Sequence, residues 1–152
     1  MASNPSGGEQ IDLEKLSLEQ LQQIKAEFQQ EVEAIQDSIQ TLYNCKAKYA
    51  TSKEALEQVQ PDWQNKEILV PLTSSMYVPG TIKDMDNFVI DVGTGYYVEK
   101  DLETSKDYFK RRVEYVQEQM EKIEKIQYQK SRFLSVLVSV MEQKQQMAKQ
   151  GA

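Results

Sequence analysis

The sequence predicts a mainly α-helical protein: a long antiparallel two-helix coiled coil, with two small β-hairpins between the helices that join an oligomeric β-barrel. Two long segments contain no glycine or proline and carry apolar residues at every seventh position, which is the repeat of a coiled coil. Between these segments the apolar period changes from seven to two, as it does in β-strands. The middle region also contains one pattern twice, with the copies twenty residues apart.

Composition and charge argue against several classes of function. The chain has 152 residues, no histidine and one cysteine, so it lacks the commonest general base and cannot form an internal disulfide. Its net charge of -6 argues against a nucleic-acid partner, and no apolar run is long enough to span a membrane. We expect no catalytic residue, no metal and no cofactor. A reducing location is expected, which is compatible with the cytoplasm and the nucleus.

The polar residues 1–12 are predicted to form a disordered tail, followed by a single unit over residues 13–152. The first helix is expected over residues 18–59. Ser17 and Gln20 have the spacing of a capping box, which would start this helix, and Pro61 should stop it. The apolar stripe of this helix consists of Leu21, Phe28, Ile35, Leu42, Tyr49 and Leu56.

Two β-hairpins are predicted within residues 67–100. The segment 69–80, "LVPLTSSMYVPG", can be laid on the segment 89–100, "VIDVGTGYYVEK". Each copy combines an alternating strand, a three-residue loop at 73–75 or 93–95, and a short returning strand. The second loop reads Gly-Thr-Gly, which could suggest phosphate binding. A turn is favoured because no helix opens after it and no third glycine follows.

The alignment of the two copies predicts that Pro79 and Gly80 form a bend or bulge in a returning strand. A two-stranded hairpin is at best marginally stable alone, and its edges carry unpaired backbone groups. We expect these hairpins to have little to pack against within the chain and to close a barrel with neighbouring subunits. The predicted assembly residues are Ile68, Val70, Leu72, Tyr77, Val78, Phe88, Ile90, Val92, Tyr97 and Val98.

The second helix is predicted over residues 105–149. Two polar residues, Gln127 and Lys130, interrupt its apolar stripe, and such interruptions often fix the register of a coiled coil. Because the two helices match in length, the simplest arrangement folds one back on the other. The alternative is that each helix pairs with another chain. The apolar members of the stripe are Phe109, Val113, Val116, Met120, Ile123, Leu134, Leu137 and Met141.

Folding back would bring the start of the first helix and the end of the second to one free tip. There the segment 132–141, "RFLSVLVSVM", carries a second apolar stripe beside the one that faces the first helix. An exposed apolar patch of this kind usually marks an interaction site. The alternative is that this cluster packs against residues 13–18 as a closed hydrophobic plug. The candidate binding residues are Leu16, Leu18, Leu21, Phe133, Val136, Val140 and Met141.

The stretches "EILVPLTSSMYVPG" and "VIDVGTGYYVEK", flanked by two heptad helices, resemble the alpha-type subunits of the prefoldin family. The resemblance covers about Leu16 to Met141, and it is specific because beta-type subunits have only one hairpin. It implies a hexamer of two alpha-type and four beta-type subunits, whose hairpins form a double β-barrel platform with coiled coils extending from it. It also implies ATP-independent capture of unfolded proteins, notably actin and tubulin, and their delivery to the cytosolic chaperonin.

The sequence leaves two other classes of function to compare with this one. A coiled-coil adaptor could bind folded regulatory proteins while using the same hairpins for assembly. An enzyme is disfavoured, because histidine is absent and no nucleophile–base pattern is present. The basic run 110–112 has acidic neighbours and is more typical of a solvated helix face than of a nucleic-acid patch. The expected partners are therefore other prefoldin subunits, unfolded clients and the chaperonin, with neither nucleic acid nor membrane.

Overall fold

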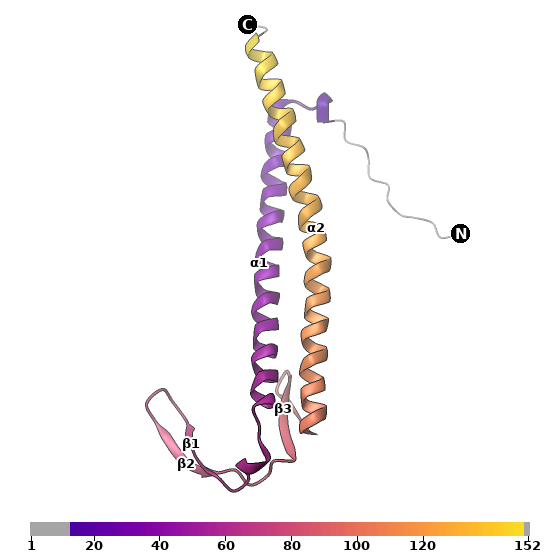
Figure 1. Cartoon of the computed structure of the whole chain (residues 1–152). Coiled ribbons are helices and arrows are strands. Elements are labelled where there is room, and N and C mark those ends of the chain that lie inside the picture. Colours follow the sequence, from indigo (N-terminus) through magenta and orange to yellow (C-terminus); the bar gives the residue numbers. More distant parts are fainter. Residues whose placement is uncertain (1–12, 151–152) are drawn as a thin grey trace, which may run out of the picture. The chain divides into compact units, whose positions relative to one another are not determined.

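The computed structural model describes residues 13–150 (Figure 1). Two long helices with two β-hairpins between them confirm the predicted fold class, whereas the shared barrel stays a prediction. The predicted tail, residues 1–12, lies outside the described residues. The elements are η1 (Leu13–Lys15), α1 (Leu18–Glu57), η2 (Pro61–Trp63), β1 (Glu67–Pro71), β2 (Tyr77–Thr81), β3 (Asn87–Gly93), β4 (Tyr96–Asp101) and α2 (Leu102–Gln150).

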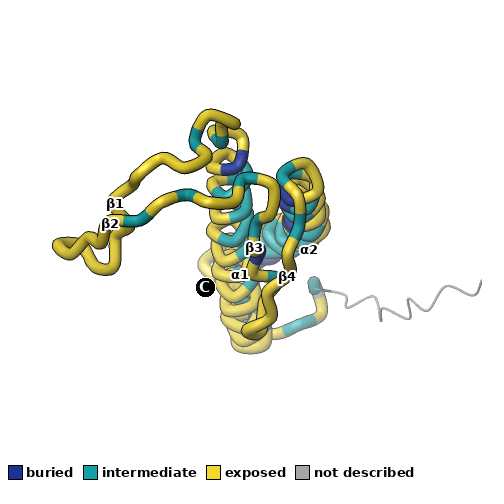
Figure 2. Tube along the Cα trace, turned by 90° about the horizontal axis from the view of Figure 1, so that it is seen from below, coloured by how far each residue is buried: buried dark blue, intermediate teal, exposed yellow. Residues whose placement is uncertain are grey.

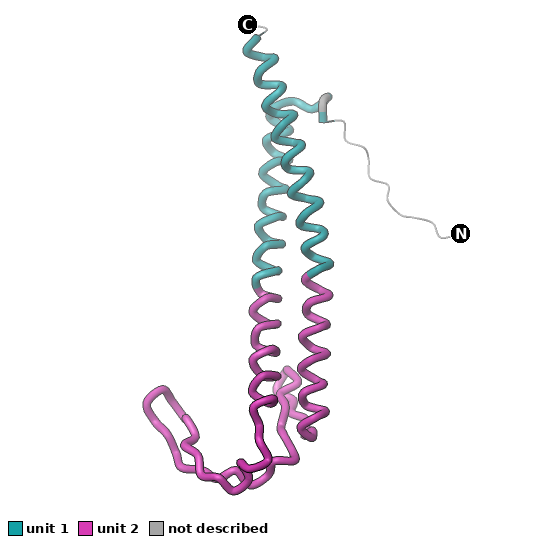
Figure 3. Tube along the Cα trace, in the orientation of Figure 1, with its two compact units in different colours: residues 1–40, 121–152 teal, residues 41–120 magenta. Residues whose placement is uncertain are grey.

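The chain divides into two compact units, which Figure 3 shows in teal and magenta. Unit 1 comprises residues 1–40 and 121–152, and unit 2 comprises residues 41–120. Each unit contains part of α1 and part of α2, and unit 2 also contains both hairpins. That residues 13–152 work as a single unit stays a prediction.

The first helix begins where the sequence predicts. The Ser17 hydroxyl accepts the backbone N–H of Gln20 at 3.2 Å, and the Gln20 side-chain oxygen accepts the backbone N–H of Ser17 at 2.9 Å. This reciprocal pair confirms the capping box, and α1 starts at Leu18. The helix ends at Glu57, two residues before the predicted end. Gln60 is extended, as expected for a residue before proline, so the chain leaves the helix ahead of Pro61.

The second helix begins earlier than predicted, at Leu102, and ends at Gln150. Asp101 explains the early start, because its carboxylate accepts the backbone N–H of Thr104 at 3.3 Å and also the Thr104 hydroxyl. The buried Ser105 hydroxyl donates to the carbonyl oxygen of Asp101 at 2.7 Å. The sequence signal was an aspartate three positions before a threonine, and the apolar repeat did not reveal it.

Both hairpins are antiparallel, and their registers are related by the predicted twenty-residue shift. Val70 pairs with Val78 in the first hairpin, and Ile90 pairs with Val98 in the second. Pro79 lies in β2 opposite Leu69, which confirms that Pro79 belongs to the returning strand rather than to the turn. The expected bulge lies elsewhere, between Asp91 and Gly93 of the second hairpin.

The predicted three-residue loop is confirmed in the first hairpin and is wrong in the second. In the first hairpin the strands end at Pro71 and Tyr77, and the backbone N–H of Leu72 still donates to the carbonyl oxygen of Met76 at 2.9 Å, so the loop closes over residues 73–75. Thr73 holds this loop closed, because its hydroxyl accepts the backbone N–H of Met76 at 3.1 Å. The second hairpin turns on two residues, Thr94 and Gly95, because Gly93 still belongs to β3. Gly93, Thr94 and Gly95 have φ angles of 107°, 53° and 80°, and this left-handed run accounts for the two glycines.

The helices pair antiparallel within the chain, in place of the alternative in which each pairs with another chain. In unit 1 the side chains of Gln36 and Gln127 share a hydrogen bond of 2.9 Å, and Lys130 forms an ion pair with Glu31. The Lys130 ammonium also lies 4.9 Å from the centre of the Phe28 ring. Gln127 and Lys130, the two polar residues that interrupt the apolar stripe of α2, therefore both bond to side chains of α1.

In unit 2 the same antiparallel pairing continues through polar contacts. The Lys46 ammonium donates to the side-chain oxygen of Gln117 at 2.8 Å, and Arg112 donates to the Tyr49 hydroxyl at 3.1 Å.

Among the residues that the structure describes, no helix is both long and apolar enough to cross a membrane.

Candidate interaction sites

The first candidate site lies in unit 1, where α1 begins and α2 ends. Leu21 and Leu137 are fully buried there, and Met141 is nearly so. We call these three residues, with the partly buried side chains packed on them, the tip cluster. It contains four of the predicted binding residues: Leu16, Leu21, Val140 and Met141. The surrounding members are Leu13, Leu16, Ile24, Leu134 and Val140.

The second apolar stripe of α2 is less exposed than the sequence suggests. We expected Phe133, Val136 and Val140 to lie off the helix contact, and this is wrong for two of them. Phe133 stacks on Phe28 of α1 with ring centres 4.6 Å apart, and Val140 packs on the tip cluster. Side chains that flank a two-helix seam can fold over it, which accounts for this burial. Leu13 and Leu16 pack on the same cluster, as in the closed-plug alternative, whereas Phe133 contacts Phe28 and Val136 stays exposed.

Val136 is 49% exposed, and two further apolar side chains on the same stripe were missed. Ile126 precedes Phe133 by seven residues, and Met147 follows Val140 by seven residues. These four residues are therefore spaced seven apart and lie on one side of α2. Both Ile126 and Met147 are exposed. Extending the seven-residue spacing beyond residues 132–141 would have revealed them. Leu18, the remaining predicted residue, is partly buried.

The second candidate site is the first hairpin, β1 and β2, in unit 2. Figure 2 shows both strands almost entirely exposed. Residues opposite each other share a face, so Val70 and Val78 lie on one face and Leu69 lies on the other. Both faces are therefore apolar and uncovered in this chain. The exposed apolar side chains are Ile68, Leu69, Val70, Leu72, Met76, Tyr77 and Val78, of which Leu69 and Met76 were not predicted.

The second hairpin differs, because one face of β3 is covered by the chain's own helices. Ile90 is buried with Leu56 of α1 and Phe109 of α2, and Phe88 and Val92 pack on the same core. The expectation that the hairpins have little to pack against within the chain is therefore wrong for β3. Phe88, Ile90 and Val92 alternate along β3 and so lie on one face of the strand. In unit 2 this face contacts both helices. Tyr97 and Val98 of β4 remain exposed.

The basic run 110–112 is divided between two environments. Arg111 forms an exposed ion pair with Asp107 at 2.8 Å. The guanidinium of Arg112 instead lies between Tyr49 of α1 and Tyr115 of its own helix α2, at 5.3 and 5.7 Å from the centres of their rings. The hydrogen bond to the Tyr49 hydroxyl raises the pKa of Arg112 above its ordinary value. Arg112 therefore contributes a fixed charge to the helix contact in unit 2.

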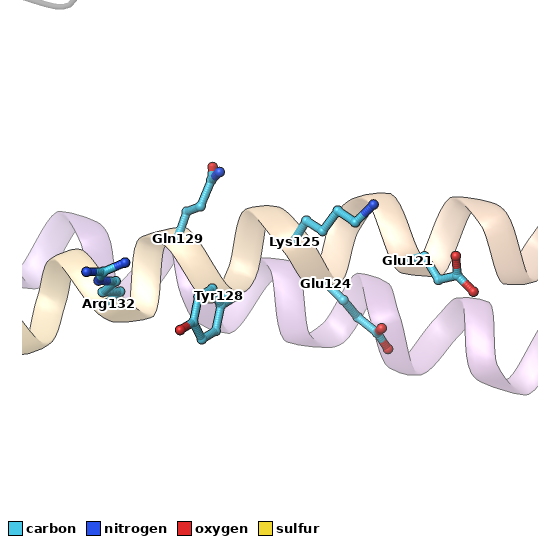
Figure 4. Close-up of a pocket in the computed structure, with 6 residues that line it drawn as sticks. All are labelled: Glu121, Glu124, Lys125, Tyr128, Gln129 and Arg132. Carbon is cyan, nitrogen blue, oxygen red and sulfur yellow. The ribbon is translucent and has the colours of Figure 1, made fainter.

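A shallow groove of about 680 Å³ lies along α2 in unit 1 (Figure 4). Its labelled side chains are polar or charged except for the ring of Tyr128, and none is a predicted binding residue. Within the described residues, no group of three or more cysteine, aspartate, glutamate or histidine side chains could hold a metal ion. The groove is lined by Glu121, Glu124, Lys125, Tyr128, Gln129 and Arg132.

The chain matches the family described as "Prefoldin: Prefoldin subunit" over residues 28–147. It is 67% identical over 146 residues to probable prefoldin subunit 5 of Drosophila melanogaster, and this match covers 96% of this chain and 87% of that protein. It is 43% identical over 143 residues to prefoldin subunit 5 of Homo sapiens, which covers 93% of each. Its fold is similar to the cryo-EM structure of filamentous PFD from Methanocaldococcus jannaschii, with a TM-score of 0.66 and 19% identity. That match covers 78% of this chain and 98% of the other.

Proposed function

The chain belongs to the prefoldin family as an alpha-type, non-enzymatic co-chaperone subunit, and we propose that it captures unfolded proteins, notably actin and tubulin, and delivers them to the cytosolic chaperonin. The observation that carries the proposal is that Ile126, Val136 and Met147 expose apolar side chains along α2 of a chain that also exposes an apolar hairpin. One surface suits a changing set of unfolded clients, and the other suits permanent neighbours. We propose the cytoplasm as the place of action.

For assembly, we propose that the first hairpin joins alpha-type and beta-type prefoldin subunits in a shared β-barrel. Each strand of this hairpin has one partner, so each has a free edge, and both faces are apolar. Neighbouring strands would satisfy the edges and cover the faces. Phe88, Ile90 and Val92 have a second role in this proposal, because they hold β3 on its own helices while Tyr97 and Val98 meet neighbours.

The two copies of the repeat offer a matched pair of variants for assembly. Val70 is 39% exposed and Ile90, at the equivalent position, is 5% exposed. Val70→Asp should leave the helices of the chain intact and abolish entry into the complex, because a carboxylate buried without a partner costs several kcal/mol. Ile90→Asp places the same charge inside unit 2 and should destabilise the chain itself.

Native mass and far-UV circular dichroism of co-expressed subunits separate the two effects. We expect Val70→Asp to give a helical chain outside the complex, and Ile90→Asp to lose thermal stability as well. A full complex that contains Val70→Asp and dissociates at the wild-type temperature would contradict the role of this face.

For clients, we propose binding at Leu16, Leu18, Leu21, Phe133, Val136, Val140 and Met141, with the exposed side chains of Ile126 and Met147 extending the same surface. Val136 supports the proposal most directly, because it is exposed beside a buried cluster. Exposed methionine suits varied partners, because its side chain is flexible and polarizable.

The adjacent residues Val136, which is exposed, and Leu137, which is buried, allow client binding to be tested separately from stability. Val136→Ser removes exposed apolar area and should weaken suppression of actin aggregation, with the complex intact and its melting temperature unchanged. Leu137→Ser, a change inside the tip cluster, should lower stability by about 2–5 kcal/mol. Light scattering of diluted denatured actin at a fixed concentration of complex is the readout. If the complex with Val136→Ser still suppressed actin aggregation fully, clients would not bind at this surface. If the complex bound native proteins in preference to denatured ones, the function of a coiled-coil adaptor would be favoured instead.

A further inference from the structure

The chain folds back over the tip cluster just before α1 begins. Leu13, in η1, and Leu16 pack on the buried core of Leu21, Leu137 and Met141. The Lys144 ammonium, on the last part of α2, donates a hydrogen bond to the carbonyl oxygen of Leu16. The segment 13–16 is therefore tied to both helices of unit 1 at the place where client binding is proposed.

We propose that residues 13–16 form a cover that competes with clients for the tip cluster, an inference that rests on the proposed client site. In the closed state the cover fills the apolar surface that an unfolded chain would use. In the open state Leu21, Leu137 and Met141 would join the exposed Val136 in one larger apolar surface. This changes the role of Leu16 from the client-binding residue proposed above: together with Leu13 it acts as an internal substitute for a client.

The cover can open without unwinding α1, because the start of that helix is stabilised independently. Ser17 and Gln20 satisfy each other's backbone N–H groups, and the carbonyl oxygen of Ser17 accepts the N–H of Leu21 at 3.0 Å. None of these three bonds involves residues 13–16. The cover itself contains a three-residue 3-10 turn, whose hydrogen-bond geometry is poorer than that of an α-helix. Short segments outside the long helices open locally at a lower free energy than the core does.

Competition determines the direction of the effect. A client that needs the open state binds with an apparent affinity reduced by the fraction of chains that are open. If about a tenth of chains are open, removing the cover raises the affinity up to about tenfold. Direct contact between Leu16 and the client would have the opposite effect, because the same change would weaken binding. The sign of the change therefore separates a cover from a binding residue.

The first experiment tests the cover without a client. In the assembled complex with Cys45→Ser, which removes the single cysteine of the chain, Met141→Cys introduces a thiol in the tip cluster. Leu13→Ser with Leu16→Ser should raise the rate of its reaction with a maleimide several-fold. Lys144→Ala should raise it less, and Lys144→Arg, which keeps a donor, should leave it near its starting value. Hydrogen exchange of residues 17–24, with and without the leucine changes, gives the same comparison without an introduced cysteine. An unchanged rate in both measurements would overturn the cover.

The second experiment measures capture of fluorescently labelled, denatured actin by complexes that carry only the cover changes. Leu13→Ser with Leu16→Ser should bind more tightly, by up to about tenfold, and Lys144→Arg should match the wild type. Weaker binding would overturn the cover and assign Leu16 to direct contact. Faster thiol reaction with unchanged capture would overturn the client site itself, and with it the competition. Native mass confirms that the variants remain assembled.

Discussion

Val70 and Ile90 occupy the same position in two copies of one pattern, and the structure gives them different environments. Both lie inside a strand, and both pair with a valine. Ile90 meets Leu56 and Phe109 of the helices, whereas Val70 meets no helix core and stays exposed. At the scale of single residues, strand position and burial are therefore separate properties in this chain. The first follows from local alternation and the second from neighbours that are distant in sequence.

Asp101 offers a residue-scale prediction about pH. Hydrogen bonds from the Thr104 hydroxyl and backbone N–H hold the pKa of Asp101 below its ordinary value of 3.8. A lowered carboxylate pKa stabilises the folded state above the unfolded pKa, and this stabilisation is lost as the pH falls through the folded pKa. Asp101→Asn keeps a capping oxygen but cannot titrate. The variant should therefore unfold at a lower temperature than the wild type near neutral pH.

The difference in melting temperature between wild type and Asp101→Asn should shrink below about pH 4. Thermal scans of the complex from pH 7 downward provide the measurement. Other aspartates with lowered pKa, Asp62 and Asp84, remain in both proteins and cancel in the comparison. A melting difference that stays constant over the whole pH range would contradict a capping role for the Asp101 carboxylate.

At the scale of elements, polar side chains determine how α1 and α2 align. In unit 1 Gln36 meets Gln127 and Glu31 meets Lys130, and each pair joins residues nearly one hundred positions apart. A shift by one heptad, about two helix turns, would separate these partners and leave polar groups against apolar ones. Apolar contacts alone tolerate such shifts, because a seven-residue repeat looks alike at every heptad. The two polar interruptions in the second helix therefore favour one register over its neighbours.

Charge reversal tests this role of the ion pair. Glu31→Lys places two ammonium groups side by side and should cost about 1 kcal/mol, because both partners are partly solvated. The reversed pair, Glu31→Lys with Lys130→Glu, should recover part of this loss. Recovery is incomplete because a glutamate cannot replace the contact between the Lys130 ammonium and the Phe28 ring.

Thermal unfolding of the assembled complex would measure these changes, with Gln30→Lys as a control at an exposed neighbouring position. Equal melting temperatures for the single and reversed variants would show that the pair does not contribute to alignment.

At the scale of the whole molecule, this chain exposes more apolar surface than its own fold can cover. The first hairpin has apolar side chains on both faces, and the stripe of α2 is exposed at Ile126, Val136 and Met147. Large exposed apolar patches on a protein mark interaction sites or aggregation risks. The chain therefore behaves as one part of an assembly, in agreement with its membership of the prefoldin family.

Expression of the chain alone should accordingly give self-association or aggregation, whereas co-expression with beta-type subunits should give a soluble complex. Size-exclusion chromatography with light scattering would distinguish the two states. Val70→Asp with Leu69→Asp, which adds charge to both faces of the first hairpin, should reduce self-association of the lone chain. A stable wild-type monomer at micromolar concentration would contradict the assembly role of the hairpins.

The helices, the two hairpins and the twenty-residue relation between their registers follow from the sequence by itself, because periodicity and capping are local and can be read in any chain. Only the tertiary structure decided which copy of the repeat is covered, since Val70 and Ile90 have the same local pattern. It also decided that Phe133 and Val140 turn inward. Their burial depends on Phe28 and Leu21, more than one hundred positions away, and on how far each side chain reaches across the helix pair. The early start of α2 at Leu102 combines both cases, because the capping signal of Asp101 is local but lies outside the apolar repeat.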